Sequence, residues 1–112
     1  MPTIRIALAN TRFPSTREES LEIVLEAMKE ASDGAAAIIC FPECLLPGYR
    51  IGSTAPLPDQ DWLNGAWSII DARAAELGLG VILGTERVEA GGLLITARVT
   101  NSDGTFAGFQ DK

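Results

Sequence analysis

The apolar residues near the start of the chain recur first at every second position and then at every third or fourth. Residues 3–9 alternate three apolar side chains with smaller or polar ones: Ile4, Ile6 and Leu8. This alternation predicts a β-strand. Four later apolar residues follow the spacing of an amphipathic helix: Leu21, Val24, Leu25 and Met28. Ser15 and Glu18 match a capping box at the start of this helix, and Gly34 is expected to cap its end.

The rest of the chain holds one more helical pattern and four strand patterns. The continuous apolar run AAAIICF, at 35–41, predicts a strand covered on both faces. Residues 44–61 contain three prolines and predict a loop. A helix is predicted over 59–78, with a buried stripe made of Leu63, Ala66, Trp67, Ile70, Ala74 and Leu77. Strands are predicted at 80–88, 93–100 and 105–110.

The predicted order of elements is therefore βαβαβββ, which places the chain in the α/β class. Each strand–helix–strand unit requires parallel strands joined by a right-handed crossover. The last three strands are separated by short turns, at 89–92 and 101–104, which predicts an antiparallel meander. We therefore expect a mixed β-sheet with both helices on one face.

Composition and charge narrow the classes of protein. The chain has 112 residues, of which 46% are apolar and 21% are charged, a balance typical of one globular domain. Its net charge of −6 and the lack of a Lys/Arg cluster argue against a nucleic-acid partner. No apolar run reaches the roughly 18 residues that span a bilayer, and the N-terminus does not resemble a signal peptide. We therefore expect a cytoplasmic protein that binds neither nucleic acid nor membrane.

The chain has two cysteines, Cys40 and Cys44, and no histidine. The lack of histidine excludes a Ser–His–Asp or Cys–His site built within these residues. Two cysteines spaced C-x3-C offer too few ligands for zinc, and they are too few for a disulfide scaffold. We expect no metal and no cofactor.

Three charged residues follow or end predicted strands that should point the same way. Glu43 follows the strand at 35–41, Glu86 lies near the end of the strand at 80–88, and Lys112 follows the last strand. Ligands of open α/β sheets bind at the edge formed by the carboxyl ends of the strands. Charged residues also end strands simply because chains reach the surface there. For Glu86, a second acid of a pocket and a solvated strand end are equally good interpretations.

The stretch FPECLLPGY, residues 41–49, is more specific. Together with the opening strand IRIALAN, the strand GVILGTE and the ending DGTFAGFQDK, it resembles the N-terminal half of the nitrilase superfamily of carbon–nitrogen hydrolases. The resemblance covers nearly the whole chain. The FPE and GY motifs are fairly specific in a strand–helix–strand context, whereas a lysine after a hairpin is a weaker signal.

The resemblance implies a fold and a chemistry. The family fold is an α-β-β-α sandwich, of which this sheet and its helices would form half. The family cleaves non-peptide C–N bonds with a Cys–Glu–Lys triad, in which the cysteine attacks a carbonyl or nitrile carbon. Carried over by motif, Glu43 is the general base, Lys112 stabilises the tetrahedral intermediate, and Tyr49 could line the substrate pocket. The breadth of amidases in the family favours a small amide over a nitrile as substrate.

The family's nucleophile has no counterpart in this sequence. We therefore expect residues 1–112 to be the N-terminal part of a single domain, truncated before the nucleophilic cysteine and inactive alone. Cys40 is interpreted as a small core residue and Cys44 as a partly buried thiol without a role. In an alternative interpretation, Cys44 is a substitute nucleophile. An activated thiolate needs a positioned base or cation, and side chains adjacent in sequence, such as those of Glu43 and Cys44, seldom point at one another.

Two functions from other classes stay open. The chain could be a catalytically silent binding or assembly module of the same fold. It could also be an unrelated flavodoxin-like binding domain, against which the meander and the FPE motif argue.

One face of the predicted sheet would lack a cover. The strand at 93–100 has an apolar face made of Leu93, Ile95, Ala97 and Val99. Its other face carries Leu94, Thr96, Arg98 and Thr100. An uncovered apolar sheet face exceeds the few hundred Å² typical of a monomer's largest patch. We therefore expect a homo-oligomer, or pairing with the missing half of the fold.

Overall fold

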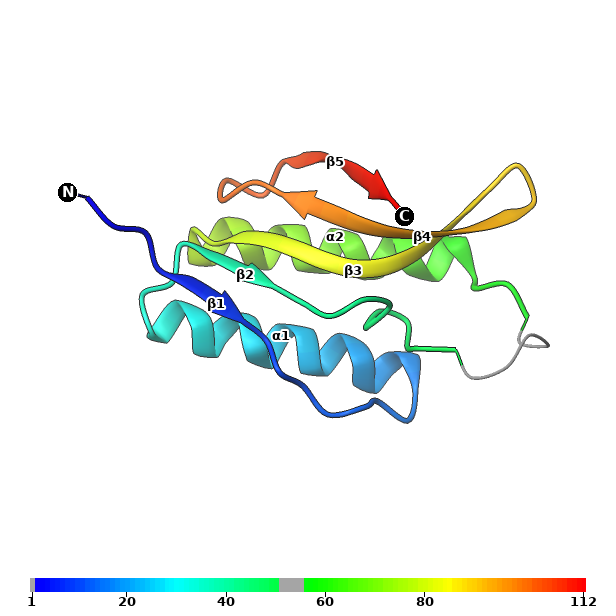
Figure 1. Ribbon diagram of the computed structural model, residues 1–112, viewed down its shortest axis with the longest axis horizontal. Helices are drawn as coiled ribbons and strands as arrows, with labels where there is room; N and C mark the ends of the chain where they lie inside the picture. Colours follow the sequence, from blue (N-terminus) through cyan, green and yellow to red (C-terminus); the bar gives the residue numbers. More distant parts are fainter. Residues whose placement is uncertain (1, 51–55) are drawn as a thin grey trace.

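A five-stranded sheet and two helices make up the computed structural model, which describes residues 2–50 and 56–112 (Figure 1). The predicted order of elements is confirmed: β1 (Ile6–Leu8), α1 (Arg17–Asp33), β2 (Ile38–Cys40), α2 (Gln60–Leu77), β3 (Gly80–Glu89), β4 (Gly92–Thr100) and β5 (Phe106–Asp111).

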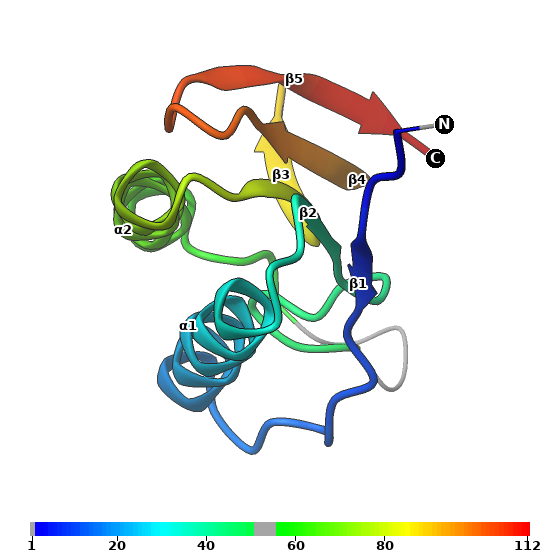
Figure 2. The same cartoon turned by 90° about the vertical axis from the view of Figure 1, so that its left-hand side faces the viewer.

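The strands lie side by side in chain order. Neighbouring strands are parallel from β1 to β3 and antiparallel from β3 to β5. Both helices lie on the same side of the sheet (Figure 2). The α/β class and the mixed sheet with helices on one face are therefore confirmed. The carboxyl ends of β2, β3 and β5 point to the same edge of the sheet.

Helix α1 begins one residue later than the predicted capping box. Thr16 is the N-cap, and its side chain accepts a hydrogen bond from the backbone N–H of Glu19 at 3.0 Å. The carboxylate of Glu19 in turn accepts from the N–H of Ser15 at 3.4 Å. The prediction of Ser15 and Glu18 was wrong by one position because the sequence STREE contains two overlapping matches to the motif.

The prediction that Gly34 caps the end of α1 is confirmed. Its φ is −83°, however, so its conformation does not require glycine. The left-handed residue is Ala35, with φ 61°, and the N–H of Ala36 bonds to the carbonyl of Ala31 at 2.9 Å. The chain therefore changes direction at Ala35, one residue after the glycine, and continues toward β2.

Helix α2 matches its predicted stripe except at Leu77, which is half-buried. Asp59 is the N-cap and Gly78, with φ 61°, is the left-handed C-cap. The side chains that point to the sheet are buried: Leu63, Ala66, Trp67, Ile70 and Ala74. The core forms where these residues meet the buried face of α1 and the sheet residues Ile39, Val81 and Leu83.

In the part of the chain that the structure describes, helices cover only one face of the sheet, and the opposite face is covered only toward the end of β3, where Gly84 and Glu86 are buried. In β2, Ile39 is buried whereas Ile38 and Cys40 are half-buried, so the prediction of a strand covered on both faces was wrong. Following the register, the face away from the helices carries Ile6, Leu8, Ile38, Cys40, Ile82, Gly84, Ile95, Ala97 and Val99. We call this set the open face. The reason for the difference is that both helices pack on the same side.

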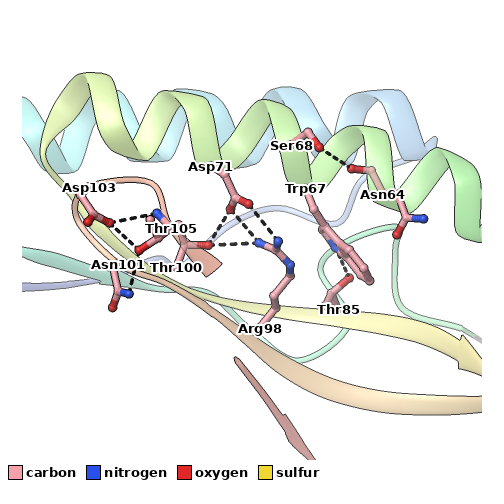
Figure 3. A network of polar contacts seen from close by, with 10 residues as sticks. All are labelled: Asn64, Trp67, Ser68, Asp71, Thr85, Arg98, Thr100, Asn101, Asp103 and Thr105. Atoms are coloured by element: carbon pink, nitrogen blue, oxygen red, sulfur yellow. Dashed lines mark hydrogen bonds and ion pairs between the residues drawn. The ribbon is translucent and has the colours of Figure 1, made fainter. Parts of the chain in front are cut away.

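The polar face of β4 is the one that α2 covers. Thr96, Arg98 and Thr100 are buried there. Arg98 makes two hydrogen bonds to the carboxylate of Asp71 on α2, at 2.7 and 2.9 Å (Figure 3). The hydroxyl of Thr100 donates to the same carboxylate at 2.7 Å. A buried ion pair thus anchors the β4–β5 hairpin to α2.

No helix among the described residues has both the length and the apolar character to cross a membrane.

Candidate functional site

The segment after β2 forms a short arch over strand β3. The backbone N–H of Phe41 donates to the carbonyl of Ile82 at 2.9 Å, and that of Leu46 donates to the carbonyl of Gly84 at 3.2 Å. Residues 42–45 rise between these two attachments, and we call them the arch. β2 pairs with β3 only as far as Ile82, so the edge of β3 beyond that point is free to hold the arch.

Gly84 lets the arch lie directly on β3. A Cβ atom built at this position would lie 1.9 Å from the carbonyl oxygen of Pro42 and 2.8 Å from the Cα of Glu43. No side chain fits there without moving the backbone that carries Glu43. An isolated glycine inside a strand is a sequence signal of such a close approach, but Gly84 was not among the residues predicted for the site.

Helix α1 holds the arch from the other side. The hydroxyl of Ser20, which is fully buried, donates to the carbonyl of Leu45. Leu45 and Leu46 are buried in the core, and Cys44 takes a left-handed φ of 54°. The arch is therefore fixed by a strand, a helix and the core, so the position of Glu43 does not depend on a loose loop.

The structure brings Glu43 and Lys112 together. Lys112 extends strand β5, since its N–H donates to the carbonyl of Ile95 at 2.9 Å. Its Nζ lies 2.8 Å from Oε1 of Glu43, although the two residues are 69 positions apart in the sequence. The hydrogen bond from Lys112 to Glu43, and then the charge of Glu43, raise the pKa of the lysine. Lys112 is therefore an ammonium ion at neutral pH.

This ion pair is open to solvent in the described part of the chain. The side chain of Glu43 is 41% exposed and that of Lys112 is 70% exposed. The two residues border a cavity of about 360 Å³ over the open face, whose floor includes Ile82, Gly84 and Ile95. A carboxylate that acts as a general base near neutral pH is best placed in an apolar, water-poor pocket. The apolar floor is present, but the described residues provide no roof.

Glu86 is not a solvated strand end. Its side chain is 1% exposed, and its Oε2 lies 2.6 Å from Nε of Arg50. Its Oε1 has no hydrogen-bond partner among the described residues. Glu86 is thus a buried acid, and its pairing with Arg50 ties the segment after the arch to β3. Arg50 carried no signal in the sequence that pointed to this contact.

Tyr49 borders a second cavity, of about 310 Å³, on the other side of the arch. Its walls come from the arch and from the segment before α1, including Phe13 and Pro14, and they are mostly apolar. Glu43 borders this cavity as well. Phe13 was missed by sequence reasoning because it stands alone among polar residues outside any periodic pattern.

The two cysteines differ from one another. Cys44 is 2% exposed, and burial, followed by the charges of Glu86 and Glu43, raises the pKa of its thiol to about 11. Cys44 therefore stays protonated at neutral pH and is a poor nucleophile. Cys40, expected in the core, is half-buried on the open face next to Ile82.

Comparisons with known proteins support the fold. Among the solved structures that share it are the following three. An amidase from Nesterenkonia sp. is 21% identical with a TM-score of 0.80, covering 97% of this chain and 42% of that one. A carbon–nitrogen hydrolase from Helicobacter pylori is 17% identical with a TM-score of 0.81, covering 97% and 39%. A variant of the Nesterenkonia amidase in complex with butyramide is 22% identical with a TM-score of 0.83, covering 97% and 42%.

The chain therefore spans about two fifths of the length of these solved structures. At these identities the likeness shows the fold alone. No curated protein sequence matches the chain. The sequence model of the carbon–nitrogen hydrolase family, in contrast, matches residues 5–112, nearly the whole chain. The chain belongs to the carbon–nitrogen hydrolase family.

Proposed function

We propose that this chain supplies the general base and the lysine of an amidohydrolase that cleaves a non-peptide C–N bond by a Cys–Glu–Lys mechanism. In this proposal Glu43 is the base, Lys112 stabilises the oxyanion, and the nucleophilic cysteine lies outside residues 1–112. The observation that carries the proposal is the contact of 2.8 Å between Nζ of Lys112 and Oε1 of Glu43. An exposed ion pair contributes little to stability, so a structural role explains this contact poorly.

The proposed reaction has two stages. Glu43 takes the proton of the cysteine thiol as the sulfur attacks the amide carbonyl carbon, and the ammonium of Lys112 faces the oxyanion that develops. Glu43 then gives this proton to the nitrogen, the C–N bond breaks, and ammonia leaves an acyl thioester. In the second stage Glu43 deprotonates a water that attacks the thioester, and the protonated Glu43 returns its proton to the departing sulfur.

The state of Cys44 supports a nucleophile from outside this chain. Its thiol is buried and its pKa is raised to about 11, whereas a nucleophilic cysteine needs a lowered pKa or an aligned base. An active-site cysteine is present in the Nesterenkonia amidase, where acrylamide adds to it. A cysteine from further along the fold would reach the cavity over the open face.

The proposed substrate is a small amide in preference to a nitrile. Support comes from the structural relatives, since forms of the Nesterenkonia amidase bind butyramide and acrylamide. Those ligands belong to that protein, and their transfer to this chain is part of the proposal.

The test uses the natural protein that carries this sequence, with its coding sequence read past codon 112 and its intact mass measured. We expect ammonia release from small amides, and we expect Glu43→Gln to abolish it. The amide keeps the size and shape of the side chain but cannot take a proton, so the loss should be at least about 10²-fold while the fold persists.

Glu26→Gln, an exposed carboxylate on the outer surface of α1, is the matched control and should leave turnover unchanged. Near-normal ammonia release by Glu43→Gln, with circular dichroism like that of the wild type, would contradict the role of Glu43.

A second candidate is a catalytically silent binding or assembly module of the same fold. The unfavourable state of Cys44 favours it for residues 1–112 taken alone. A natural protein of 11.9 kDa that releases no ammonia would select this alternative.

A further inference from the structure

The cavity beside Tyr49 has a composition that selects for uncharged groups. Its lining consists of Thr11, Phe13, Pro14, Pro42, Glu43, Leu45 and Tyr49. Two aromatic rings, two prolines and a leucine dominate this set. Among the described residues, Glu43 is its one charged member, and it is already paired with Lys112, which leaves no free countercharge there for a charged ligand group.

Glu43 borders both this cavity and the one that Lys112 borders. The cavity over the open face is lined by ten residues, and Glu43 is the single residue that it shares with the cavity beside Tyr49. An amide whose carbonyl lies at the Glu43–Lys112 pair therefore has an apolar hollow within reach on the side of the arch. In a primary carboxamide, the acyl group is the only part that carries carbon substituents.

We propose that the cavity formed by Phe13, Tyr49 and the arch is a specificity site for the uncharged, apolar acyl group of the substrate. This inference rests on the proposed function and narrows the substrate class to primary amides with an alkyl or aryl acyl group larger than acetyl. A volume of about 310 Å³ accommodates a short chain or one ring, at the small end of ligand cavities.

The proposal predicts a dependence on chain length. Each methylene transferred from water to an apolar cavity should raise kcat/KM about fourfold, so butyramide should exceed acetamide by roughly fifteenfold. The natural protein that carries this sequence is assayed with acetamide, propionamide, butyramide and 4-aminobutyramide. We expect the cationic amide to be turned over no better than acetamide.

Phe13→Ala should remove one wall of the cavity without touching Glu43 or Lys112. We expect the ratio of kcat/KM for butyramide to that for acetamide to fall to a few-fold, since the apolar contact is lost. Phe13→Leu should retain most of this ratio. Ile69→Ala truncates an exposed apolar residue on α2 and should leave the ratio unchanged.

Two results would overturn the specificity site. One is the same chain-length dependence in Phe13→Ala as in the wild type. The other is a preference for 4-aminobutyramide, which would make the site one for cations.

Direct binding separates this inference from the proposed function. If the wild-type protein hydrolyses no amide, the proposed function fails, and butyramide is titrated into ¹⁵N-labelled protein instead. Shifts confined to the amide groups of Thr11, Leu45 and Tyr49, stronger than those with acetamide, would support the cavity as an apolar site. No shifts at these residues, or equal shifts with both amides, would refute it.

Discussion

At the scale of single residues, Gly84 determines where Glu43 lies. The backbone of Pro42 and Glu43 passes so close to strand β3 that a methyl group at position 84 would overlap it. We expect Gly84→Ala to lower the free energy of unfolding by about 1–3 kcal/mol, because the arch must shift and its packing is lost. Urea unfolding measures the loss, and the amide resonance of Glu43 in an NMR spectrum reports the displacement.

Gly65 on α2 is the matched control for this substitution. A Cβ at this position would meet no atom within 4 Å. Alanine is favoured over glycine inside a helix, so Gly65→Ala should stabilise the protein by about 0.5–1 kcal/mol. If Gly84→Ala is as stable as Gly65→Ala, the arch does not lie in close contact with β3 at position 84.

Cys44 should make stability depend on pH in the alkaline range. Folding raises the pKa of this thiol from 9.0 to about 11 because the side chain is buried and Glu86 and Glu43 lie nearby. Below pH 9 the thiol is protonated in both states, so its contribution to stability is complete there. Between pH 9 and 11 the unfolded chain loses this proton first, and the free energy of unfolding should fall as pH rises.

The measurement compares urea unfolding at pH 8, 9.5 and 10.5 for Cys44→Ala and Cys40→Ala. Other alkaline groups titrate in both variants, so the comparison isolates the thiol. We expect a shallower decline in Cys44→Ala than in Cys40→Ala. Equal slopes would show that Cys44 does not have a raised pKa in the folded protein.

At the scale of elements, the ion pair between Asp71 and Arg98 joins α2 to the β4–β5 hairpin. The guanidinium of Arg98 also lies 5.1 Å from the ring centroid of Trp67 and 4.7 Å from that of Phe106. Asp71→Ala leaves this buried cation without its carboxylate, so we expect a loss of about 3 kcal/mol in the free energy of unfolding. Because β5 carries Lys112 at its end, the same change should loosen the contact with Glu43.

The exposed ion pair between Arg73 and Glu76 on the same helix provides the control. Glu76→Ala should cost less than about 0.5 kcal/mol, since solvent screens such pairs. The double variant Asp71→Leu/Arg98→Met should recover much of the stability lost in Asp71→Ala. Equal unfolding curves for Asp71→Ala and Glu76→Ala would contradict the anchoring role of Asp71.

At the scale of the whole molecule, the open face is an apolar sheet surface that the described helices do not cover. Ile6 and Leu8 are 51% and 79% exposed on β1, and they continue the row of apolar residues across the sheet. A face of this kind favours association. We expect residues 1–112, expressed alone, to sediment as a particle heavier than 11.9 kDa.

Leu8→Lys should shift this association toward the monomer, because a buried ammonium at the interface is costly. Ile69→Lys, at a similarly exposed apolar residue on the opposite side of the molecule, should leave the sedimentation pattern unchanged. A stable, monodisperse monomer of the wild-type chain would refute the expectation of self-association.

Much of the fold could be predicted from the sequence because it follows from local rules. The strand and helix patterns, the turns at 89–92 and 101–104, and the glycine after α2 define the elements and their order. Two boundaries differ from the prediction: α1 begins at the second of two overlapping capping motifs, and β2 is shorter than its apolar run. The common edge of Glu43 and Lys112 followed from strand direction, whereas their proposed roles came from the resemblance.

The sequence by itself therefore determined the class of fold and the edge where the candidate site lies, since periodicity, capping and strand direction act over short distances, whereas the family was inferred from the resemblance carried by the FPE and GY motifs. Tertiary structure alone decided which sheet face is covered, that Glu86 is buried against Arg50, and that Phe13 and Tyr49 share a cavity. It also decided that the polar face of β4 is the buried one, because Asp71 from α2 meets Arg98 there. These outcomes depend on contacts between distant segments, and no local pattern encodes which side chain a residue will meet.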